Sequence, residues 1–424
     1  MNQKNLPRRK FIEGGPQTLK GFRDFLPADM AVRNYVKNLL ISVFETYGFE
    51  PLETPALEYA SVLKGKYNSE TDEKLGYFFK DNGDREVGLR YDLTIPVAKV
   101  LAIYGNQILL PFKRYQIQSV WRADNTQKGR YREFIQCDID TFGTTSPLAD
   151  AEIISIIYTA TQKLNFKEFT IRLNSRSVLL DTLAKNGIND NQKTVLQSLD
   201  KFQKIGQDRV KKELISKGLN ITQIDSLFDY INKAKPDDQL QQVFAAVKSF
   251  GIPETFYTFD PTLVRGCDYY TGTIFETVVK QPSIGSIGGG GRYDKLIETL
   301  GGPDIPAVGY SFGFEPIIDV INELNLLPDL PKTKTKIMVA NFGPETINDS
   351  LKLVSQLRQN NIASTFYPDT DKLGKQFKYA DSLGIKYVAV IGPDEAKSKT
   401  VTLKNMTTGE QKTVPVSEIS NNLI

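Results

Sequence analysis

The chain reads FKRYQIQSVWR at residues 112–122 and YREFIQCDIDTF at residues 131–142, with a polar connection between the two segments. Both are rich in aromatic and β-branched residues, so they predict two long strands that pair as a hairpin. A shorter hairpin is predicted upstream, with strands at residues 77–80 and 86–90 around Asp81-Asn82-Gly83-Asp84. Consecutive hairpins without helical crossovers are typical of an antiparallel sheet.

Helices and further strands are predicted on either side of these hairpins. Apolar residues at three-to-four spacing predict a helix over residues 28–47, and Gly48 stands where a left-handed cap belongs. A second helix is expected at residues 148–164, and strands return at residues 256–259 and 273–279. Because the strands are grouped, the pattern predicts an α+β domain built on an antiparallel sheet.

Two other regions of the chain have a different character. The lysine-rich residues 175–255 are helical in pattern, which predicts a helical insertion. Beyond a proline-containing linker, strand and helix patterns alternate, which is typical of an α/β domain. We therefore expect a first domain formed by residues 1–174 and 256–326, an insertion at residues 175–255, and a C-terminal domain at residues 332–424.

Composition excludes several kinds of chemistry. The 424-residue chain has a net charge of +3 and contains no histidine, which rules out histidine bases, Ser-His-Asp triads and histidine metal ligands. Two cysteines, Cys137 and Cys267, form neither a disulfide framework nor a metal cluster. No stretch is apolar enough to span a membrane or to form a signal-peptide core, so we expect a cytoplasmic protein without a membrane partner.

The long hairpin is basic around its loop. Arg122 and Arg130 flank this loop, and arginines held on rigid strands suit a triphosphate because the planar guanidinium matches phosphate oxygens. A basic hairpin that only faces solvent is the alternative. Residues 113–132 contain one acid, Asp124, and six cations, which are Lys113, Arg114, Arg122, Lys128, Arg130 and Arg132.

Two later segments are candidates for a binding site. LVRGCDYYTGTIFE at residues 263–276 combines an arginine, a glycine turn and two tyrosines, which could form a polar pocket or only the edge of an aromatic strand. IGGGGRYD at residues 287–294 contains four consecutive glycines, which permit close backbone approach to a ligand. A flexible turn is the alternative, and the run is not a Walker loop because no Gly-Lys-Ser/Thr follows.

In this order, the segments resemble the class II aminoacyl-tRNA synthetases, and specifically the histidyl-tRNA synthetase family, over nearly the whole chain. Residues 263–276 are similar to the histidine-binding signature of the family, and residues 121–134 to the second motif of the class. LRYDLT at residues 89–94 resembles the amino-acid-binding loop. Thr54-Pro55 resembles the first motif, which implies a homodimer, and residues 282–302 resemble the family's glycine-rich strand and helix.

The resemblance implies ATP-dependent activation of histidine, with Mg²⁺, followed by transfer of the histidyl group to tRNA(His). Arg122 and Arg265 would be the catalytic residues, and Arg122, Asp124 and Arg130 would bind ATP. Arg265 would lie beside the substrate carboxylate and the α-phosphate, where it would neutralise charge during the attack. No metal site built from protein side chains alone is expected.

The resemblance also implies how histidine and tRNA are bound. Asp92 would be the charge partner of the α-amino group, and Asp140 and Tyr270 would each hold one imidazole nitrogen. Neutral imidazole has one donor and one acceptor, so a site that pairs both rejects rings that cannot. The C-terminal domain resembles an anticodon-binding domain. The full set implied to bind histidine is Asp92, Thr94, Gln136, Asp140, Arg265, Tyr269 and Tyr270.

The chain departs from the class at its third motif, which reads GYSFGFEP at residues 309–316. Pro316 stands where the class has an arginine that packs on adenine, and no arginine occurs between Arg292 and Arg358. Proline supplies neither a charge nor a donor. One alternative is therefore a catalytically inactive relative that regulates ATP phosphoribosyltransferase in histidine biosynthesis, and another is a free-standing RNA-binding or sensor protein.

Overall fold

The computed structural model describes residues 16–64, 75–126, 130–265, 269–282, 284–299, 301–328 and 330–423. Lys128 of the basic hairpin and the signature residues 266–268, which include Cys267, lie outside these ranges. The chain divides into two compact units, Met1–Leu327 and Pro328–Ile424. Within the described ranges, every helix is too short or too polar to cross a membrane.

The larger unit contains an eight-stranded sheet with the strand order β1-β5-β6-β11-β10-β9-β7-β8. Neighbouring strands are antiparallel except in the pairs β1–β5 and β7–β8 at the two edges, which are parallel. The predicted antiparallel sheet is therefore confirmed, with parallel pairing at its margins. Its strands are β1 (Glu50–Pro51), β5 (Phe112–Trp121), β6 (Glu133–Phe142), β7 (Phe169–Ser175), β8 (Tyr257–Phe259), β9 (Thr273–Val279), β10 (Ser286–Arg292) and β11 (Ala307–Gly313).

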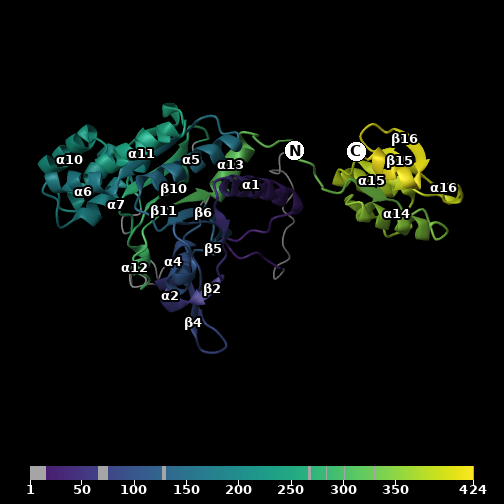
Figure 1. Ribbon diagram of the computed structural model, residues 1–424, viewed down its shortest axis with the longest axis horizontal. Helices are drawn as coiled ribbons and strands as arrows, with labels where there is room; N and C mark the ends of the chain where they lie inside the picture. The colour runs from purple at the N-terminus through teal and green to yellow at the C-terminus, as the bar shows by residue number, and fades with distance from the viewer. Residues whose placement is uncertain are drawn as a thin grey trace. The chain divides into compact units, whose positions relative to one another are not determined.

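Four helices pack together with one face of this sheet. Cys137 and Ile139 of β6 belong to their shared apolar core. Because side chains alternate along a strand, Gln136, Asp138 and Asp140 point to the opposite face. The helices are α1 (Pro27–Thr46), α5 (Pro147–Lys163), α11 (Asp238–Ser249) and α13 (Phe314–Glu323), and Figure 1 shows them grouped on the same side of the sheet.

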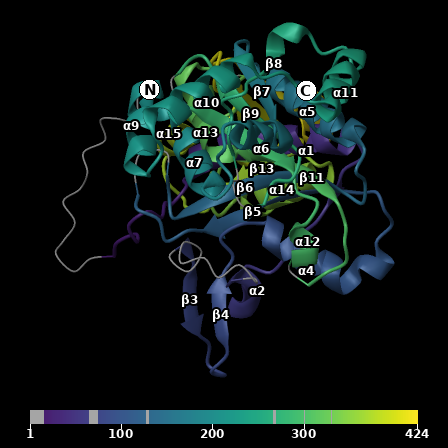
Figure 2. The same ribbon diagram turned by 90° about the vertical axis from the view of Figure 1, so that its left-hand side faces the viewer.

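A second sheet has three strands in the order β2-β4-β3. Figures 1 and 2 show it projecting beyond one end of the large sheet. Strands β3 and β4 pair antiparallel, which confirms the shorter predicted hairpin. The elements here are β2 (Leu57–Tyr59), β3 (Tyr77–Lys80), β4 (Glu86–Leu89), the helices α2 (Ala60–Lys64), α4 (Thr94–Tyr104) and α12 (Leu296–Thr299), and the 3₁₀ turn η2 (Gly105–Gln107).

Five helices follow β7 and enclose an apolar core of their own. Leu263 and Val264, which immediately precede Arg265, belong to the same core, and Gln203 Nε2 donates to Thr262 Oγ1 at 3.2 Å. The start of the signature segment is thus anchored on the inserted helices. The helices are α6 (Arg176–Lys185), α7 (Gln192–Leu199), α8 (Phe202–Ile205), α9 (Gln207–Ser216) and α10 (Ile221–Lys233), and the 3₁₀ turn η3 (Glu254–Phe256) precedes β8.

The C-terminal unit is built on a mixed sheet with the order β13-β12-β14-β15-β16. The first three strands are parallel, as the predicted strand–helix alternation requires, whereas the final antiparallel hairpin of β15 and β16 was not predicted. Its strands are β12 (Ile337–Val339), β13 (Ser364–Phe366), β14 (Tyr387–Val390), β15 (Thr400–Asn405) and β16 (Gln411–Pro415). Its helices are α14 (Ile347–Gln359), α15 (Leu373–Leu383), α16 (Pro393–Ser398) and η4 (Val416–Asn422).

Arg292 at the end of β10 ties the large sheet to α5. Its guanidinium forms an ion pair with Asp150, and both side chains are almost fully buried. The same group donates to the carbonyl oxygens of Thr144 at 2.8 Å and Ser146 at 3.2 Å. The charge is therefore satisfied inside the protein, and it fixes the strand relative to the helix N-terminus.

We predict that Asp150→Asn lowers the free energy of unfolding by about 3 kcal/mol, because it removes the buried partner of Arg292 and leaves only the more exposed Asp294, 3.0 Å away, as an ionic partner. Urea denaturation followed by far-UV circular dichroism measures the loss. Lys295→Ala is the control, since Lys295 forms exposed ion pairs with Glu298 and Asp304 and should change stability little. Equal effects of the two substitutions would contradict the prediction.

Candidate active site

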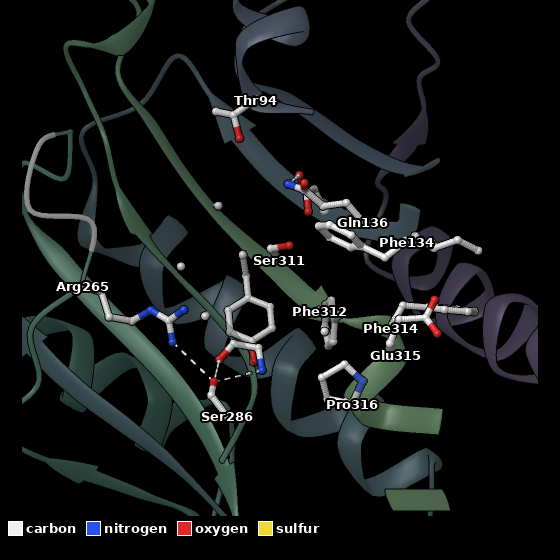
Figure 3. A pocket seen from close by; sticks show the side chains of 18 of the residues that line it. Thr94, Phe134, Gln136, Arg265, Ser286, Ser311, Phe312, Phe314, Glu315 and Pro316 are labelled. Carbon is white, nitrogen blue, oxygen red and sulfur yellow. Dashed lines mark hydrogen bonds between the residues drawn. The ribbon is translucent and has the colours of Figure 1, made fainter. Parts of the chain in front are cut away.

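A cavity of about 550 Å³ lies on the face of the large sheet that carries the polar side chains of β6 (Figure 3). Strands β6, β10 and β11 line it, together with the first residue of α4, the segment before β9 and the first turn of α13. Asp92 is absent from the lining and instead accepts the backbone N–H of Ile95 at 3.1 Å. The other predicted site residues all line the cavity, namely Thr94, Arg122, Asp124, Arg130, Gln136, Asp140, Arg265, Tyr269 and Tyr270.

At one end of the cavity, Asp140 is held by two buried partners. The Tyr293 hydroxyl donates to Asp140 Oδ1, and Arg114 Nη2 lies 2.5 Å from Asp140 Oδ2. Burial raises the pKa of Asp140, and the Arg114 guanidinium opposes this shift. Tyr270 lines the same cavity, and the centroid of its ring lies 4.3 Å from the ring centroid of Tyr269. The carboxylate and the phenol thus offer an acceptor and a donor to a ligand.

Gln136 and Asp138 form a second polar group on β6. Gln136 Nε2 donates to Asp138 Oδ2 at 2.8 Å. The other oxygens, Gln136 Oε1 and Asp138 Oδ1, are buried and have no hydrogen-bond partner among the described residues. Figure 3 shows Gln136 and Ser311 on neighbouring strands, facing the cavity. Both unpartnered atoms are acceptors, so this group suits a ligand that carries several N–H donors.

Arg265 reaches the cavity from the signature segment. Its Nη1 donates to Glu276 Oε1 at 2.6 Å and lies 3.4 Å from Ser286 Oγ (Figure 3). Arg172 holds the other Glu276 oxygen at 3.0 Å. Glu276 is thereby shared between two arginines, so Arg265 keeps part of its positive charge for a ligand.

The remaining cations and Pro316 line the cavity as well. Arg122 Nε donates to the carbonyl oxygen of Tyr91 at 2.9 Å, and its guanidinium lies 5.2 Å from the Phe134 ring centroid. Arg130 and Asp124 also line the cavity. Pro316 also lines the cavity, so the departure from the class lies within the site itself.

Glu315, next to Pro316, is held by two arginines of the N-terminal region. Arg33 donates to its two oxygens at 2.7 and 2.9 Å, and Arg23 donates at 2.7 Å. The Arg23 guanidinium lies 3.3 Å from the ring centroid of Tyr131, which lines the cavity. Burial would raise the pKa of Glu315, but Arg33 and Arg23 hold it below its ordinary value. Two positive charges therefore surround one negative charge beside Pro316.

The four glycines form strand β10, so the interpretation as a flexible turn was wrong. A Cβ at Gly289 would overlap the Arg265 guanidinium, and a Cβ at Gly290 would overlap the carbonyl oxygen of Gly309 on β11. Glycine is needed here because a side chain and a neighbouring backbone occupy the space that a Cβ would take.

Sequence reasoning gave no site role to three residues that shape the cavity, Asp138, Tyr293 and Arg114, the last of which it counted only among the cations of the basic hairpin. For Arg114 and Asp138, the signal was the alternation of polar and apolar residues along the strands. Polar residues recur at every second position of β5 and β6, although their intervening residues are apolar and pack in the core. Such a pattern in a buried strand pair indicates a polar cavity on one face. Tyr293 approaches Asp140 only through the pairing of β11 between their strands, which the sequence does not reveal.

We predict that Gly290→Ala lowers the free energy of unfolding by about 3 kcal/mol, because the new methyl group meets the backbone of a neighbouring strand. Gly289→Ala should cost less than about 1 kcal/mol, since it meets the end of a flexible side chain. Urea denaturation of both variants measures their free energies of unfolding for direct comparison. A larger loss for Gly289→Ala would contradict this account of the strand.

Comparisons with known proteins identify the family to which the chain is similar. Residues 21–317 match the family model for histidyl-tRNA synthetase, and residues 336–424 match an anticodon binding domain. The histidine–tRNA ligase of Clostridium tetani is 39% identical over 95% of this chain and 97% of its own length. The histidine–tRNA ligase of Cytophaga hutchinsonii is 38% identical over 96% of this chain and 99% of its own length.

Solved structures give the same result. The histidyl-tRNA synthetase of Nostoc sp. PCC 7120 superposes with a TM-score of 0.82 at 32% identity, over 96% of this chain and 98% of that one. The apo histidyl-tRNA synthetase of S. aureus superposes with a TM-score of 0.73 at 25% identity, over 96% of this chain and 100% of that one. The chain belongs to the histidyl-tRNA synthetase family.

Proposed function

We propose that the chain is a histidine–tRNA ligase that uses ATP to form histidyl-adenylate and then transfers the histidyl group to the 3′ end of tRNA(His). The observation that carries this proposal is one cavity lined by a polar pair, Asp140 and Tyr270, together with the cations Arg122, Arg130 and Arg265. The names of the curated relatives support the same activity. They favour it over the regulatory-subunit alternative.

Histidine would be recognised through its ring. Asp140 would accept the N–H of the neutral imidazole, and the Tyr270 hydroxyl would donate to the other nitrogen. Tyr293 and Arg114 fix the Asp140 carboxylate, which therefore cannot turn to suit another ring. Burial raises the pKa of Tyr270, so its phenol stays protonated and able to donate.

Adenylation would follow from the position of the cations. In that step a carboxylate oxygen of histidine attacks the α-phosphorus of ATP, and the bond to the pyrophosphate oxygen breaks. We propose that Arg265 and Arg122 neutralise the charge at the α-phosphate, and that Arg130 and Asp124 contact the distal part of ATP. Fixed cations stabilise such a transition state without a covalent enzyme intermediate.

Mg²⁺ fits as an ion that accompanies ATP. Among the described residues, His, Cys, Asp and Glu side chains form no cluster of three that could hold a metal. Magnesium is commonly held by one or two carboxylates together with substrate phosphates. Asp124 lines the cavity, whereas Glu315 is engaged by Arg23 and Arg33. We propose that Asp124 would face the ion, which neutralises charge on the leaving pyrophosphate.

The domain organisation, the dimer and the location stay predictions. The helices of residues 176–233 share a core that supports a separate insertion, whereas α11, within the predicted boundary of 175–255, packs in the main core. The match of residues 336–424 to an anticodon binding domain supports tRNA binding by the C-terminal unit. A homodimer formed through the first motif and a cytoplasmic location are proposed with the family resemblance as their support.

The purified chain should catalyse exchange of pyrophosphate into ATP with histidine and with no other amino acid. Exchange requires formation of the adenylate, so it tests activation without tRNA. Reactions without amino acid and with a panel of other amino acids are the controls. If a folded protein binds histidine but gives no exchange, Pro316 has removed adenylation, and the regulatory alternative gains the advantage.

Arg265→Ala should lower kcat for this exchange by about 100-fold, because it removes one fixed charge from the transition state. The fold should hold, since Glu276 keeps Arg172 as its partner. Gly289→Ala should also reduce kcat by displacing the Arg265 guanidinium. Lys248→Ala, which removes an exposed cation paired with Glu254, is the control. Near-normal turnover of Arg265→Ala would remove this arginine from the mechanism.

A further inference from the structure

A row of side chains crosses three strands of the large sheet and ends at Arg172. The residues on either side of Arg172 in β7 pack in the apolar core, so Arg172 points to the opposite face of the sheet, which carries the cavity. In the strand register, Arg172 lies opposite Glu276 of β9, and Glu276 lies opposite Gly289 of β10. The Arg265 guanidinium occupies the space beside Gly289. Because neighbouring strands lie about 4.8 Å apart, Glu276 stands between the two arginines.

Charges alternate along this row. Arg172 Nε donates to Asp260 Oδ2 at 2.6 Å, and Arg172 Nη1 donates to Glu276 Oε2 at 3.0 Å. The other oxygen of Glu276 accepts from Arg265 Nη1 at 2.6 Å. The order from Asp260 to Arg265 is therefore acid, arginine, acid, arginine. An anionic ligand beside Arg265 would extend this alternation by one charge, which is favourable because each charge then has neighbours of opposite sign.

Arg265 uses one guanidinium nitrogen for its contacts within the described part of the protein. Its hydrogen bonds to Glu276 and to Ser286 both come from Nη1. This leaves Nε and Nη2 to a ligand in the cavity, which Arg265 lines. An arginine and a carboxylate frequently form a fork in which two nitrogens hold two oxygens. Arg172 opposes that arrangement here, because it occupies Glu276 Oε2.

We propose that Arg172 is a positioning residue for the adenylation step, because it holds Glu276 so that Arg265 stays directed toward the substrates. This inference rests on the proposed function, in which Arg265 acts at the α-phosphate. Without Arg172, both oxygens of Glu276 would be open to Arg265, and a fork between them would draw the guanidinium out of the cavity and neutralise it. Arg172 is absent from the cavity lining, so its effect on the reaction passes through Arg265.

The competing account is that Arg172 only braces the sheet. It connects β7 to β9 and to Asp260, which follows β8 and accepts the N–H and the hydroxyl of Thr262 at 2.9 and 2.6 Å. Loss of a brace would lower the rate whether or not Arg265 is present. Loss of a positioning residue would lower the rate only while Arg265 is there to be positioned. The two accounts therefore differ in whether the effect of Arg172 requires Arg265.

The test measures histidine-dependent pyrophosphate exchange by the full chain with Arg172→Met, Arg265→Ala and both substitutions together. Arg172→Met alone should lower kcat by about 10-fold and change the KM values for histidine and ATP by less than about 2-fold, since the lost interaction acts in the transition state. In the Arg265→Ala background, the same substitution should change the remaining rate by less than about 2-fold. Arg172→Lys, which keeps the cation, should stay within about 3-fold of the wild-type kcat. Equal losses in both backgrounds would overturn the inference.

Asp260→Asn changes the same row in the opposite direction. Loss of the Asp260 charge leaves Arg172 more strongly attracted to Glu276, while the asparagine oxygen can still accept the two hydrogen bonds from Thr262. We expect kcat to stay within about 2-fold of the wild-type value or to rise, because Arg265 is then released further from Glu276. A loss as large as that of Arg172→Met would overturn the inference. This variant keeps Arg172, so it decides the question even if Arg172→Met does not fold.

The wild-type chain separates the inference from the proposed function. Far-UV circular dichroism first shows which variants are folded, and only these are compared. If the wild-type chain exchanges pyrophosphate with histidine and folded Arg172→Met keeps near-normal kcat, the inference alone is overturned. If the wild-type chain gives no exchange, the proposed function fails, and the inference fails with it.

Discussion

The cavity depends on one constraint, which is that strand β10 carries no side chains where it passes beneath Arg265. Gly289 leaves the space that the Arg265 guanidinium occupies, and Gly290 allows the Gly309 carbonyl of β11 to approach. Glycine weakens a strand, because it adds no packing and loses more entropy on folding. The glycines of this central strand are therefore explained by the groups that pack against them. One of these groups is the guanidinium of Arg265, which the proposed reaction needs.

Buried charges around this strand are compensated in two ways. Arg292 and Asp150 form a complete unit, because backbone carbonyls accept the remaining guanidinium hydrogens. Arg114, Asp138 and Asp140 form an incomplete one, because a single cation faces two carboxylates. A complete pair stabilises the fold with both charges kept, whereas in the incomplete set burial raises the pKa of Asp138 to about 7. The two groups therefore differ in how their buried charge is compensated within one sheet.

Local sequence patterns predicted the hairpin of β5 and β6, the helix α1 and the alternating C-terminal unit, because each depends on neighbours in the chain. The basic hairpin also indicated Arg122 and Arg130, which flank its loop, whereas only the family resemblance implied a role for Tyr270. The local patterns did not reveal that Tyr293 meets Asp140, which requires the intervening strand β11 to pair with β6. The glycine run by itself left a ligand-contacting segment and a flexible turn open for residues 288–291, and only the family resemblance implied a strand, since the packing that demands glycine there comes from distant segments.

The substitution at position 316 is best understood from the acid beside it. Glu315 is buried, and Arg33 alone would neutralise it, yet Arg23 contacts it as well. The extra guanidinium lies against Tyr131, which also lines the cavity, so this end keeps a surplus positive charge without a cation at Pro316. Long-range Coulomb interactions depend on net charge and distance more than on which residue carries the charge. An anionic ligand such as ATP would therefore still meet a positive environment there, supplied by the N-terminal region of the chain.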